Sequence, residues 1–509
     1  MVVGAGPVGL VLAGLLGRAG RRVTVVERRA EPYALARAGH VDHEIMRILQ
    51  SLGAAVAVEQ DAHLADRYVF QNADGEVLMS FDYGAPGISG WRSDYIFYQP
   101  VLEAALRRTL AGLPAVEIRS GWEATDLVQD TDAVQLAIQP VLQDAAGARR
   151  LGSCSERLRA RYLVGADGAG SYIRNRLDIP WDDLGFASSW LVVDLTPIGD
   201  EPLRFPYDNT QVCDPRRPHC LFQLGRHHRR FEFAVLPDED PTRLEQASVA
   251  WELMAPYGVT PSNAAIERRA VYRFGSAVAR HFRDGRAFLA GDAAHLMPPF
   301  MGQGMCTGIR DAANLAWRID LALREPRLAD ILDDYEPERF DQSTEIVRMS
   351  IAAGEVSCTF DPAVAAERDR LFREGGMPAP QSIPGLRTGL LTDSPLAGAL
   401  SPQGRVRLVG SVGRFDDVAG RGWVLVTTDP DMVPATPALD RLGEALGLRV
   451  VVVDDVADVE GTYRRWFAGA GCTAFVARPD FYLYGTGRSA DEMATILDDL
   501  EADIQRRKL

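Results

Sequence analysis

A run of three glycines near the start constrains this 509-residue chain most. It has the spacing Gly4-x-Gly6-x-x-Gly9, directly after an apolar stretch and directly before an apolar helical segment. A second β-type stretch then ends in an acid, Glu27, 23 residues after Gly4. This order of strand, glycine turn, helix and strand is a βαβ opening. The parts lie at Met1–Val3, Gly4–Gly9, a helix to about Gly20, and Arg22–Glu27.

Each part of this opening has a physical use in holding a dinucleotide. Gly4 allows the tight turn, Gly6 lets the backbone approach a pyrophosphate, and Gly9 lets the helix pack closely on the strand. The helix N-terminus offers free N–H groups and a positive dipole end to the phosphates. Glu27 would bind ribose hydroxyls and repel a 2′-phosphate. The segment therefore predicts a site for FAD or NAD but not NADP, the alternative being a purely structural turn.

Length and composition bound the remaining possibilities. A chain of this size exceeds a single hydrophobic core, so we expect two or three domains. Hydrophobic residues at 47% and charged residues at 25% are typical of a globular enzyme. A formal net charge of -15 disfavours nucleic acid as a partner, which leaves small molecules. Assembly into a homo-oligomer is left open.

Cysteine usage and hydropathy indicate the compartment. The six cysteines include no C-x-x-C pair, which predicts neither a disulfide framework nor a zinc site, and His40 with His43 lacks the further ligands of a metal centre. The apolar run Val8–Leu16 is too short to span a bilayer and follows no basic segment, so we expect no membrane partner and a cytoplasmic location. Few residues precede Gly4, so either the native start lies upstream or the first strand is short.

The rest of the chain predicts further elements. Helices are expected near Asp42–Leu52 and Val101–Leu110, and from Gly302 to about Ala353. Short β-type runs between Trp190 and Leu236 suggest an inserted sheet. Gly375–Gly404, rich in Pro and Gly, is the clearest linker. Beyond it a small α/β unit is expected, with these elements: Trp423–Thr428, Ala438–Gly447, Leu448–Val453, Ala474–Ala477, Phe481–Tyr484 and a final helix capped by Ser489 with Glu492.

Two later turns repeat the pattern of a buried strand that leads into a glycine and an acid. The first contains Asp167-Gly168, a dipeptide that by itself is more often a plain turn. The second contains Gly291-Asp292 and leads to the loop Gly302–Met305 before a helix. Asp292 is suited to hold flavin hydroxyls, and a helix N-terminus at Gly302–Met305 would stabilise the negative charge of a reduced flavin. NAD has no such requirement, so FAD is preferred.

These three segments in this order resemble the p-hydroxybenzoate hydroxylase-type (group A) flavoprotein monooxygenases, over Met1 to about Ile351. Within the group, the chain looks most similar to 3-(3-hydroxyphenyl)propionate hydroxylase-like enzymes. That similarity lies in Ala36–Gln50, Trp190–Asp194, Cys213–Pro218, Arg229–Phe233 and Gly302–Cys306. The C-terminal unit, with Val476–Asp480, resembles the redox-inactive thioredoxin-like appendage of such hydroxylases.

The resemblance implies an α/β fold, α+β overall, with a Rossmann-like FAD-binding domain, an inserted β-sheet substrate domain and a thioredoxin-like C-terminal domain. The expected limits are 1–67, 95–180 and 276–374 for the FAD-binding parts, 68–94 and 181–275 for the substrate parts, 375–404 for the linker and 405–509 for the C-terminal domain. The expected FAD contacts are Gly4, Gly6, Pro7, Gly9, Glu27, Arg28, Arg37, Gln99, Asp167, Gly168, Asp292, Pro299, Gly302, Gly304 and Met305. No metal is expected. Arg174 is either a phosphate contact or part of a helix-face salt bridge.

The implied reaction uses NADH or NADPH to reduce FAD, and O2 to form a flavin C4a-hydroperoxide that hydroxylates a small phenolic aromatic substrate. The sequence assigns no catalytic residue. His219, His227 and His228 are expected at the surface, the alternative being a base that activates the ring, and Arg226–Arg230 as a solvated strand end, the alternative being a run that steers a substrate carboxylate. Phe186, Trp190 and Phe222 are expected in the core, the alternative being the lining of an aromatic pocket. Two alternatives stay open, a tailoring hydroxylase or epoxidase of a larger polycyclic substrate, and a non-catalytic flavin-binding sensor or assembly protein.

Overall fold

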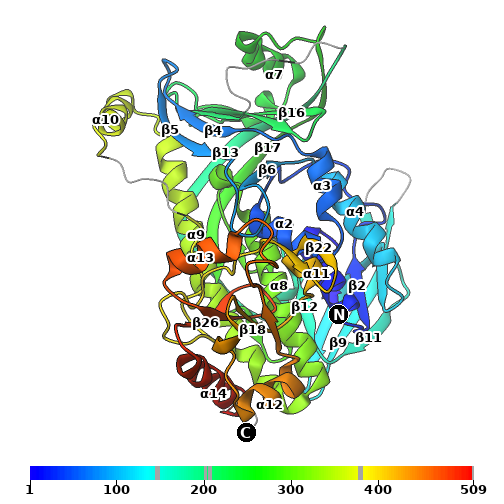
Figure 1. Ribbon diagram of the computed structural model, residues 1–509. Helices are drawn as coiled ribbons and strands as arrows, with labels where there is room; N and C mark the ends of the chain where they lie inside the picture. The colour runs from blue at the N-terminus through cyan, green and yellow to red at the C-terminus, as the bar shows by residue number, and fades with distance from the viewer. Residues whose placement is uncertain (144–148, 200–202, 204–208, 377–381, 507–509) are drawn as a thin grey trace.

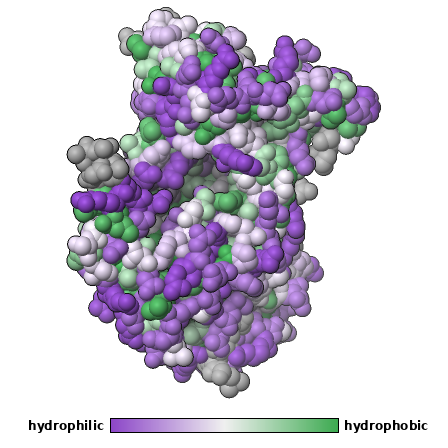
Figure 2. Space-filling view, turned by 180° about the vertical axis from the view of Figure 1, so that it is seen from behind, coloured by the Kyte–Doolittle hydropathy of each residue, from purple (hydrophilic) through white to green (hydrophobic). Residues whose placement is uncertain are grey.

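A computed structural model describes residues 1–143, 149–199, 203, 209–376 and 382–506. The molecule has a broad lower body and a narrower upper lobe (Figure 1). Seen from behind, its surface is hollowed between these two parts, and hydrophilic side chains cover most of that face (Figure 2). None of the helices within the described ranges is long and apolar enough to cross a bilayer.

The body contains a six-stranded sheet that is parallel except at one edge, where β18 pairs antiparallel with β19. Its strands are short, and the four between the two edges are mostly buried, as expected for a sheet covered on both faces. The strands in spatial order are β18 (Arg283–Asp284), β19 (Ala287–Leu289), β12 (Leu163–Gly165), β1 (Val2–Val3), β2 (Val23–Glu27) and β7 (Val116–Ser120).

Long helices cover this sheet and position its loops. The predicted βαβ opening is present as β1, α1 and β2, and Pro7 takes the first helical turn, where its missing N–H costs nothing. The helices of the body are α1 (Pro7–Arg18), α2 (His43–Gln50), α3 (Ala55–Asp61), α4 (Gln99–Ala111), α5 (Tyr172–Arg176), α8 (Gly304–Arg324) and α9 (Tyr335–Ser357), with the 3-10 helix η4 (Pro326–Asp334) between the last two.

Two smaller sheets complete the body. A four-stranded antiparallel sheet consists of β8 (Trp122–Gln129), β9 (Val134–Gln143), β10 (Arg149–Leu151) and β11 (Glu156–Ala160). A two-stranded ribbon pairs β3 (His40–Asp42) with β6 (Asp94–Ile96), and Asp42 at its end caps α2 through the N–H groups of Glu44 and Ile45. This ribbon brings residues 40 and 94 side by side, which the sequence pattern did not predict.

The upper lobe is built on an eight-stranded sheet, antiparallel except where β14 pairs with β4. Its two long strands, β13 and β17, descend into the body (Figure 1). The predicted domain limit at 275/276 therefore falls inside a continuous strand. The strands in spatial order are β20 (His295–Leu296), β17 (Ala264–Ala279), β13 (Trp181–Pro197), β16 (His228–Ala234), β15 (His219–Leu224), β14 (Thr210–Val212), β4 (Arg67–Gln71) and β5 (Val77–Asp82).

Helices pack against the outer part of this sheet. Ala250 and Met254 of α7 (Ala247–Met254) are buried against Leu191 and Phe231, which gives the lobe a hydrophobic core of its own. The other helical segments here are α6 (Pro241–Leu244), η1 (Ala255–Tyr257) and α10 (Pro362–Arg373).

The predicted linker lies partly outside the described residues, at 377–381. Its described part, 382–404, forms neither helix nor strand but is packed: Leu386 and Leu390 are buried, and Gln403 is held by Gln50 and by the carbonyl of Ser89. Pro and Gly content indicated the irregular backbone correctly. It did not indicate that this segment would be packed against the body.

The C-terminal unit contains a four-stranded sheet of order β24-β23-β25-β26 in which only β23 and β24 are parallel. We keep its thioredoxin-like fold as a prediction. Ser489 accepts the N–H of Glu492 at 3.2 Å and so caps the last helix as expected. The elements are β21 (Arg405–Leu408), β22 (Ser411–Arg414), α11 (Phe415–Val418), β23 (Val424–Thr427), η5 (Pro430–Met432), α12 (Pro437–Leu446), β24 (Arg449–Val452), α13 (Thr462–Ala470), β25 (Ala474–Ala477), β26 (Leu483–Gly487) and α14 (Ala490–Arg506).

Candidate functional site

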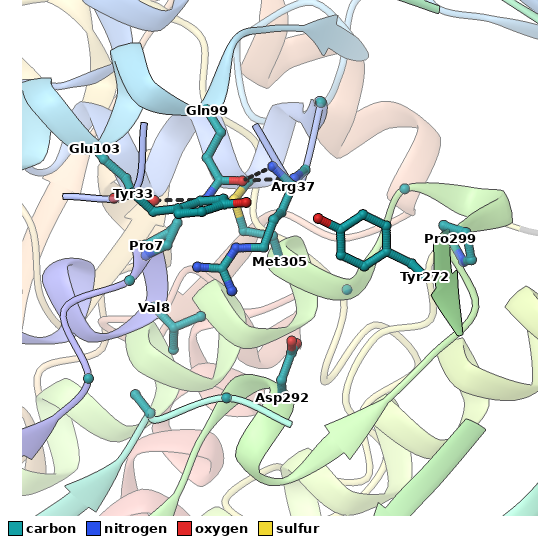
Figure 3. Close-up of a pocket in the computed structure, with 18 of the residues that line it drawn as sticks. Pro7, Val8, Tyr33, Arg37, Gln99, Glu103, Tyr272, Asp292, Pro299 and Met305 are labelled. Carbon is teal, nitrogen blue, oxygen red and sulfur yellow. Dashed lines mark hydrogen bonds between the residues drawn. The ribbon is translucent and has the colours of Figure 1, made fainter. Parts of the chain in front are cut away.

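A cavity of about 500 Å³ lies between the six-stranded sheet and the eight-stranded sheet. This volume is typical of small-molecule sites. Of the fifteen predicted FAD contacts, Gly9 does not line the cavity, and all the others do. The three glycine–acid turns, which are far apart in the sequence, therefore meet around one space. Figure 3 shows Pro7 of the first turn and Asp292 of the third at this cavity.

The first turn has the geometry that its glycines predicted. Gly4 has a φ of +104°, and a Cβ there would lie 2.3 Å from the carbonyl oxygen of Ala166. A Cβ on Gly9 would lie 2.0 Å from the carbonyl oxygen of Gly4, so Gly9 serves helix–strand packing rather than the cavity. A Cβ on Gly6 would meet nothing within 4 Å, because it would point into the cavity. Gly6 also caps α1 without a side chain, so the free N–H groups of the helix are left for an anion.

Glu27 ends β2 at the same end of the cavity, beside Arg28. One carboxylate oxygen accepts the N–H of Ala5 and the other accepts the N–H of Arg29, both at 2.8 Å. These bonds fix the carboxylate between the glycine turn and the strand end. Each oxygen keeps a further lone pair toward the cavity, which suits ribose hydroxyls.

The second turn is held by its own acid. Gly168 has a φ of +84°, and Asp167 accepts the Ser171 hydroxyl at 2.6 Å and the N–H of Ile173 at 3.1 Å. Burial raises the pKa of Asp167, although these hydrogen bonds lower it. The segment is thus both a turn and part of the cavity wall. Arg174 does neither of the things expected of it: its guanidinium stacks 4.1 Å from the ring centre of Trp181, away from the cavity.

The third turn follows β19 and continues into the 3-10 helix η2 (Gly291–Ala293). Its N–H at Gly291 donates to Asp311 of α8 at 2.9 Å, and Asp311 is also paired with His295 and Arg339. The side chain of Asp292 is exposed to the cavity, into which its carboxylate points (Figure 3). Burial raises its pKa, while His295 and Arg37 lower it.

The loop that precedes α8 forms another wall. It begins at the 3-10 helix η3 (Pro299–Met301) and turns at Gly302, where φ is +64° and a Cβ would lie 2.9 Å from His40. Gly304 and Met305 begin α8 and line the cavity. We call residues Gly302–Met305 the flavin loop. The N-terminus of a 21-residue helix thus faces the cavity, as the sequence predicted.

Arg37 and Gln99 approach the cavity together (Figure 3). The side-chain oxygen of Gln99 accepts the N–H groups of Arg37 and Ala38 at 2.9 and 2.8 Å. The Arg37 guanidinium lies 5.0 Å from the ring centre of Tyr33 and extends over the cavity toward the side of Asp292 (Figure 3). Gln99 therefore positions the segment that carries Arg37.

The far end of the cavity, toward the eight-stranded sheet, is rich in aromatic side chains, and we call it the substrate end. Sequence reasoning had placed Trp190 and Phe222 in the core, and both line the cavity, whereas Phe186 packs behind it on Phe300. These side chains were missed because a strand pattern does not show which face of a sheet meets a cavity. The substrate end is lined by His40, Tyr68, Tyr83, Ile96, Trp190, Val192, Gln211, Cys220, Phe222, Leu224, Arg230, Glu232, Arg268, Tyr272, Phe274, Met297 and Phe300.

A histidine–acid pair lies in this wall. His40 Nε2 is 2.7 Å from the carboxylate of Asp94, and His40 Nδ1 is 3.4 Å from the carbonyl oxygen of Gly302. Burial lowers the pKa of His40, but the hydrogen bonds to Asp94 and Cys306 raise it, and the net result is well above its ordinary value. The ring of Tyr83 lies 5.6 Å away, and burial raises the pKa of its hydroxyl.

The run 226–230 was expected to be a solvated strand end, and it is one only at its start, where Arg226 and His227 are exposed. Arg229 and Arg230 are buried within β16. Arg230 donates to Asp194 at 2.7 Å and to the carbonyl oxygens of Ala36 and Arg37 at 2.6 and 2.9 Å. The run therefore ties the sheet to the segment that carries Arg37.

The three histidines of this region contact other groups. His219 is mostly buried and bonds to the carbonyl oxygen of Arg217 and the hydroxyl of Tyr257, so the expectation of a surface position is wrong for it. His228 stacks on Tyr98 with ring centres 3.8 Å apart, and His227 is exposed. None of the three lines the cavity.

The comparisons with known proteins agree with this geometry. Residues 1–350 match a family described as FAD binding domain, and residues 398–503 match the HcaD C-terminal domain. A probable NADH-specific resorcinol 4-hydroxylase of Rhodococcus jostii is 36% identical over 99% of this chain and 94% of its own length. A 3-(3-hydroxy-phenyl)propionate/3-hydroxycinnamic acid hydroxylase of Escherichia coli is 30% identical over 100% of this chain and 96% of its own.

Solved structures share the fold. The flavin-dependent monooxygenase PieE, in complex with FAD and substrate, has a TM-score of 0.79 at 21% identity and covers 99% of this chain and 98% of its own. Aklavinone-11 hydroxylase with FAD and aklavinone has a TM-score of 0.77 at 23% identity, covering 98% of each chain. The open cradle at Gly6 and the acid-lined turns fit FAD. The chain therefore belongs to the FAD-binding family of group A flavoprotein aromatic hydroxylases, and it is an FAD-dependent monooxygenase that uses NAD(P)H.

Proposed function

We propose that this enzyme hydroxylates a small, uncharged phenol of the resorcinol type, with NADH and O2. The observation that carries the proposal is the pairing of charges at the substrate end. Among the described residues that line it, each cationic side chain already has a carboxylate partner. A substrate carboxylate would find no unpaired cation there, and burying an unpaired carboxylate is costly.

The pairing is close and buried. Arg230 and Arg268 lie 2.7 and 2.6 Å from the two oxygens of Asp194, and Arg230 lies 3.5 Å from Glu232. His40 lies 2.7 Å from Asp94. Both arginines also donate to the backbone carbonyl of Ala36, so turning one toward a substrate would break two hydrogen bonds. These cations thus maintain the shape of the pocket and do not provide a free carboxylate site.

The named relatives are consistent with this choice. The resorcinol 4-hydroxylase acts on a phenol without a carboxylate and is named as NADH-specific. The hydroxyphenylpropionate and hydroxycinnamate hydroxylases act on one-ring phenols with an acidic chain, at 30% and 31% identity. A polycyclic substrate, the earlier alternative, is not favoured, because the neighbours named for such substrates support the fold alone. A non-catalytic sensor is also disfavoured, since the relatives matched over the whole chain are named hydroxylases.

The residues of the site suggest how the substrate is held. Trp190, Phe222 and Phe300 provide apolar walls for an aromatic ring and exclude water. Tyr83 has a neutral hydroxyl that can bond to a phenol oxygen. His40 is held by Asp94 in the same wall, 5.6 Å from the ring of Tyr83. We propose that this arrangement orients the phenol oxygen and so positions the ring that is hydroxylated.

The fifteen predicted FAD contacts remain a proposal, supported by fourteen of them meeting at one cavity. Bound FAD, with NADH and O2, supplies the electrophilic oxygen. The protein supplies the phosphate cradle at Gly6 and Pro7, the ribose partner Glu27 and the polar partner Asp292. The N-terminus of α8 at Gly304 supplies positive potential beside the flavin.

A substrate panel tests the proposal. Resorcinol, phenol, 3-(3-hydroxyphenyl)propionate and 3-hydroxycinnamate are each added to the FAD-loaded enzyme with NADH or NADPH, and NADH oxidation and product mass are measured. We expect resorcinol to give the highest kcat/KM with NADH and a product heavier by one oxygen atom. A higher kcat/KM with the two carboxylated phenols would contradict the proposal, as would a preference for NADPH.

Further expectations are part of the proposal. A cytoplasmic location is expected from the scattered free cysteines, and a homo-oligomer stays open. The domain limits inferred from the sequence, apart from the one at 275/276 inside β17, and the thioredoxin-like fold of the C-terminal unit are also retained as proposals. Limited proteolysis checks the limits, because cleavage is expected at exposed backbone between domains.

A further inference from the structure

A buried tyrosine of the C-terminal unit, Tyr482, hydrogen-bonds to the body, and the connection continues from there through further side chains. Tyr482 precedes β26, is 3% exposed and donates its hydroxyl hydrogen to the carboxylate of Glu44 in α2, at 2.8 Å. Glu44 is itself buried, 438 residues away in the sequence. The hydrogen bond holds this buried carboxylate in place, because loss of the donor would leave a buried charge without a partner.

The second step of the connection is an ion pair. The other oxygen of Glu44 accepts from Arg310 Nε of α8 at 2.6 Å, and Arg310 is buried. Arg310 spans three acceptors at once, because its remaining nitrogens donate to Asp42 at 2.5 Å and to the side-chain oxygen of Gln303 at 3.0 Å. A guanidinium with all its partners in one plane holds them in fixed relative positions.

The third step reaches the flavin loop. Gln303 lies between Gly302 and Gly304, which both line the cavity, and its side chain also donates to Asp42 at 3.2 Å. Its backbone carbonyl accepts from Thr307 and so begins the hydrogen bonding of α8. Gln303 itself is buried and points away from the cavity, so it acts on the site through the backbone of the loop.

The docking of the C-terminal unit does not depend on the Tyr482 hydroxyl. Arg47 pairs with Asp416 at 2.7 Å, and Arg478 pairs with Glu338 at 2.7 Å, both across the same interface and both buried. The ring of Tyr482 would also remain buried in a phenylalanine variant. Removal of the hydroxyl therefore tests the connection to the loop rather than the interface as a whole.

We infer that Tyr482 is a positioning residue for the flavin: through Glu44, Arg310 and Gln303 it fixes the backbone of Gly302–Met305, so that the C-terminal unit is part of the FAD site. The connection has four members, each held by side-chain hydrogen bonds of 3.0 Å or less. The inference rests on FAD binding at this loop and is independent of which phenol is hydroxylated.

The test compares Tyr482→Phe with Tyr484→Phe in the full-length protein. Tyr484, two residues further along, is also buried and donates its hydroxyl to Asp503 at 2.8 Å, but within the C-terminal unit. FAD affinity of the apoprotein, the visible spectrum of the bound flavin and its midpoint potential are measured without phenol, together with thermal unfolding.

We expect Tyr482→Phe to weaken FAD binding about fivefold, within the range of couplings carried through packed networks. The visible flavin bands should also shift and the midpoint potential become more negative, because a displaced α8 N-terminus stabilises the reduced flavin less. Tyr484→Phe should leave affinity, spectrum and potential at their wild-type values. Equal changes in both variants, or changes that merely follow thermal stability, would overturn the inference.

A double-mutant cycle tests the route. In a Glu44→Gln background, Tyr482→Phe should have a much smaller effect on FAD affinity than in the wild type, because its partner has already changed. Additive effects would show that Tyr482 does not act through Glu44. Failure of the substrate panel would contradict the proposed function and leave these flavin measurements unaffected.

Discussion

At the scale of single residues, Gly6 differs from Gly4 and Gly9 in the reason why the position is a glycine. Gly4 and Gly9 are required by the protein's own backbone, since a Cβ on either would lie 2.3 Å or less from a carbonyl oxygen. Gly6 has an ordinary extended backbone and an open space where its Cβ would be. A bound pyrophosphate, which the backbone must approach closely, gives a reason for the absence of a side chain there.

We therefore predict that Gly6→Ala folds but binds FAD poorly. Gly6 is the N-cap of α1 and makes no side-chain hydrogen bond, so the substitution should change the free energy of unfolding by about 1 kcal/mol or less. Overpacking costs about 1–3 kcal/mol, so the FAD dissociation constant should rise about ten- to hundredfold. Gly469→Ala in α13, also into open space, is the control. Equal FAD affinity in the Gly6 variant and wild type would refute the assignment of the cradle.

A second prediction concerns His40 and the pH dependence of the free energy of unfolding. Its pKa in the folded protein lies above the ordinary value of 6.5, because Asp94 and Cys306 outweigh burial. A raised folded pKa means that the stabilisation is fully present below pH 6.5 and is lost as the pH rises through the folded pKa. The groups that face the ring are Asp94, Cys306, Tyr83 and Asp42.

The measurement is urea unfolding of wild type and His40→Asn across this range. The variant should be less stable by about 3 kcal/mol at acidic pH, as for a broken buried pair. The difference should become smaller as the pH rises through the raised pKa of His40 in the folded protein. A difference that stays constant or grows with pH would contradict a protonated His40.

At the scale of elements, α8 connects the third turn to the flavin loop. Its N-terminus carries the flavin loop, and Asp311, two turns further on, accepts the N–H of Gly291 beside Asp292. Asp311 is fully buried between His295 and Arg339. The third turn and the loop are therefore positioned by one helix, and its charge partners matter for both.

Asp311→Asn should be strongly destabilising. It removes one charge from a buried group of ion pairs, at a cost of about 3–5 kcal/mol. Asp320→Asn is the matched control in the same helix, since its pair with Arg21 is partly exposed and worth about 1 kcal/mol or less. Chemical unfolding of both variants gives the comparison, and similar losses of stability in the two would count against this role for Asp311.

The predictions from sequence were best where the signal is local. Glycine turns, acids at strand ends and Ala474–Ala477 were identified because turn chemistry and β-propensity act over a few residues. The pattern did not indicate β17, whose strand alternates exposed arginines with half-buried residues, nor α10 and α13. The flavin side of the cavity was thus largely predictable.

The substrate end of the cavity could not be predicted from the sequence, because it depends on contacts between distant segments. His40 faces the cavity because β3 pairs with β6. Arg230 of β16 is buried because it packs on the segment at Ala36 and donates to its carbonyl oxygen. Composition instead suggested surface positions for His219 and for the arginine run. A charged residue is buried when a partner lies opposite, and a single sequence does not reveal that partner.

At the scale of the whole molecule, body and C-terminal unit share one hydrophobic core. Buried Trp423, Leu425 and Leu497 of the C-terminal unit belong to the same cluster as Leu10 and Leu49 of the body. Buried ion pairs cross the same interface, as between Arg47 and Asp416. These contacts make independent unfolding of the C-terminal unit costly.

We predict that the protein unfolds in a single transition when it is titrated with urea under conditions in which it does not aggregate. Flavin release, tryptophan fluorescence and far-UV circular dichroism should give the same midpoint, because loss of the C-terminal unit exposes the shared core. The measurement is a urea titration followed by all three signals. A separate early transition in which the C-terminal unit unfolds and FAD stays bound would contradict both the shared core and the inferred role of Tyr482.

The central claim is that three separated turns enclose one flavin nucleotide. Titration of the apoprotein with FAD tests it most directly, with Gly6→Ala, Glu27→Gln, Asp167→Asn and Asp292→Asn measured beside the wild type. The account predicts one FAD per chain and weaker binding in all four variants, which sample the three turns and the strand end after the first turn. Failure of the wild type to bind FAD, or undiminished binding in all four variants, would contradict it.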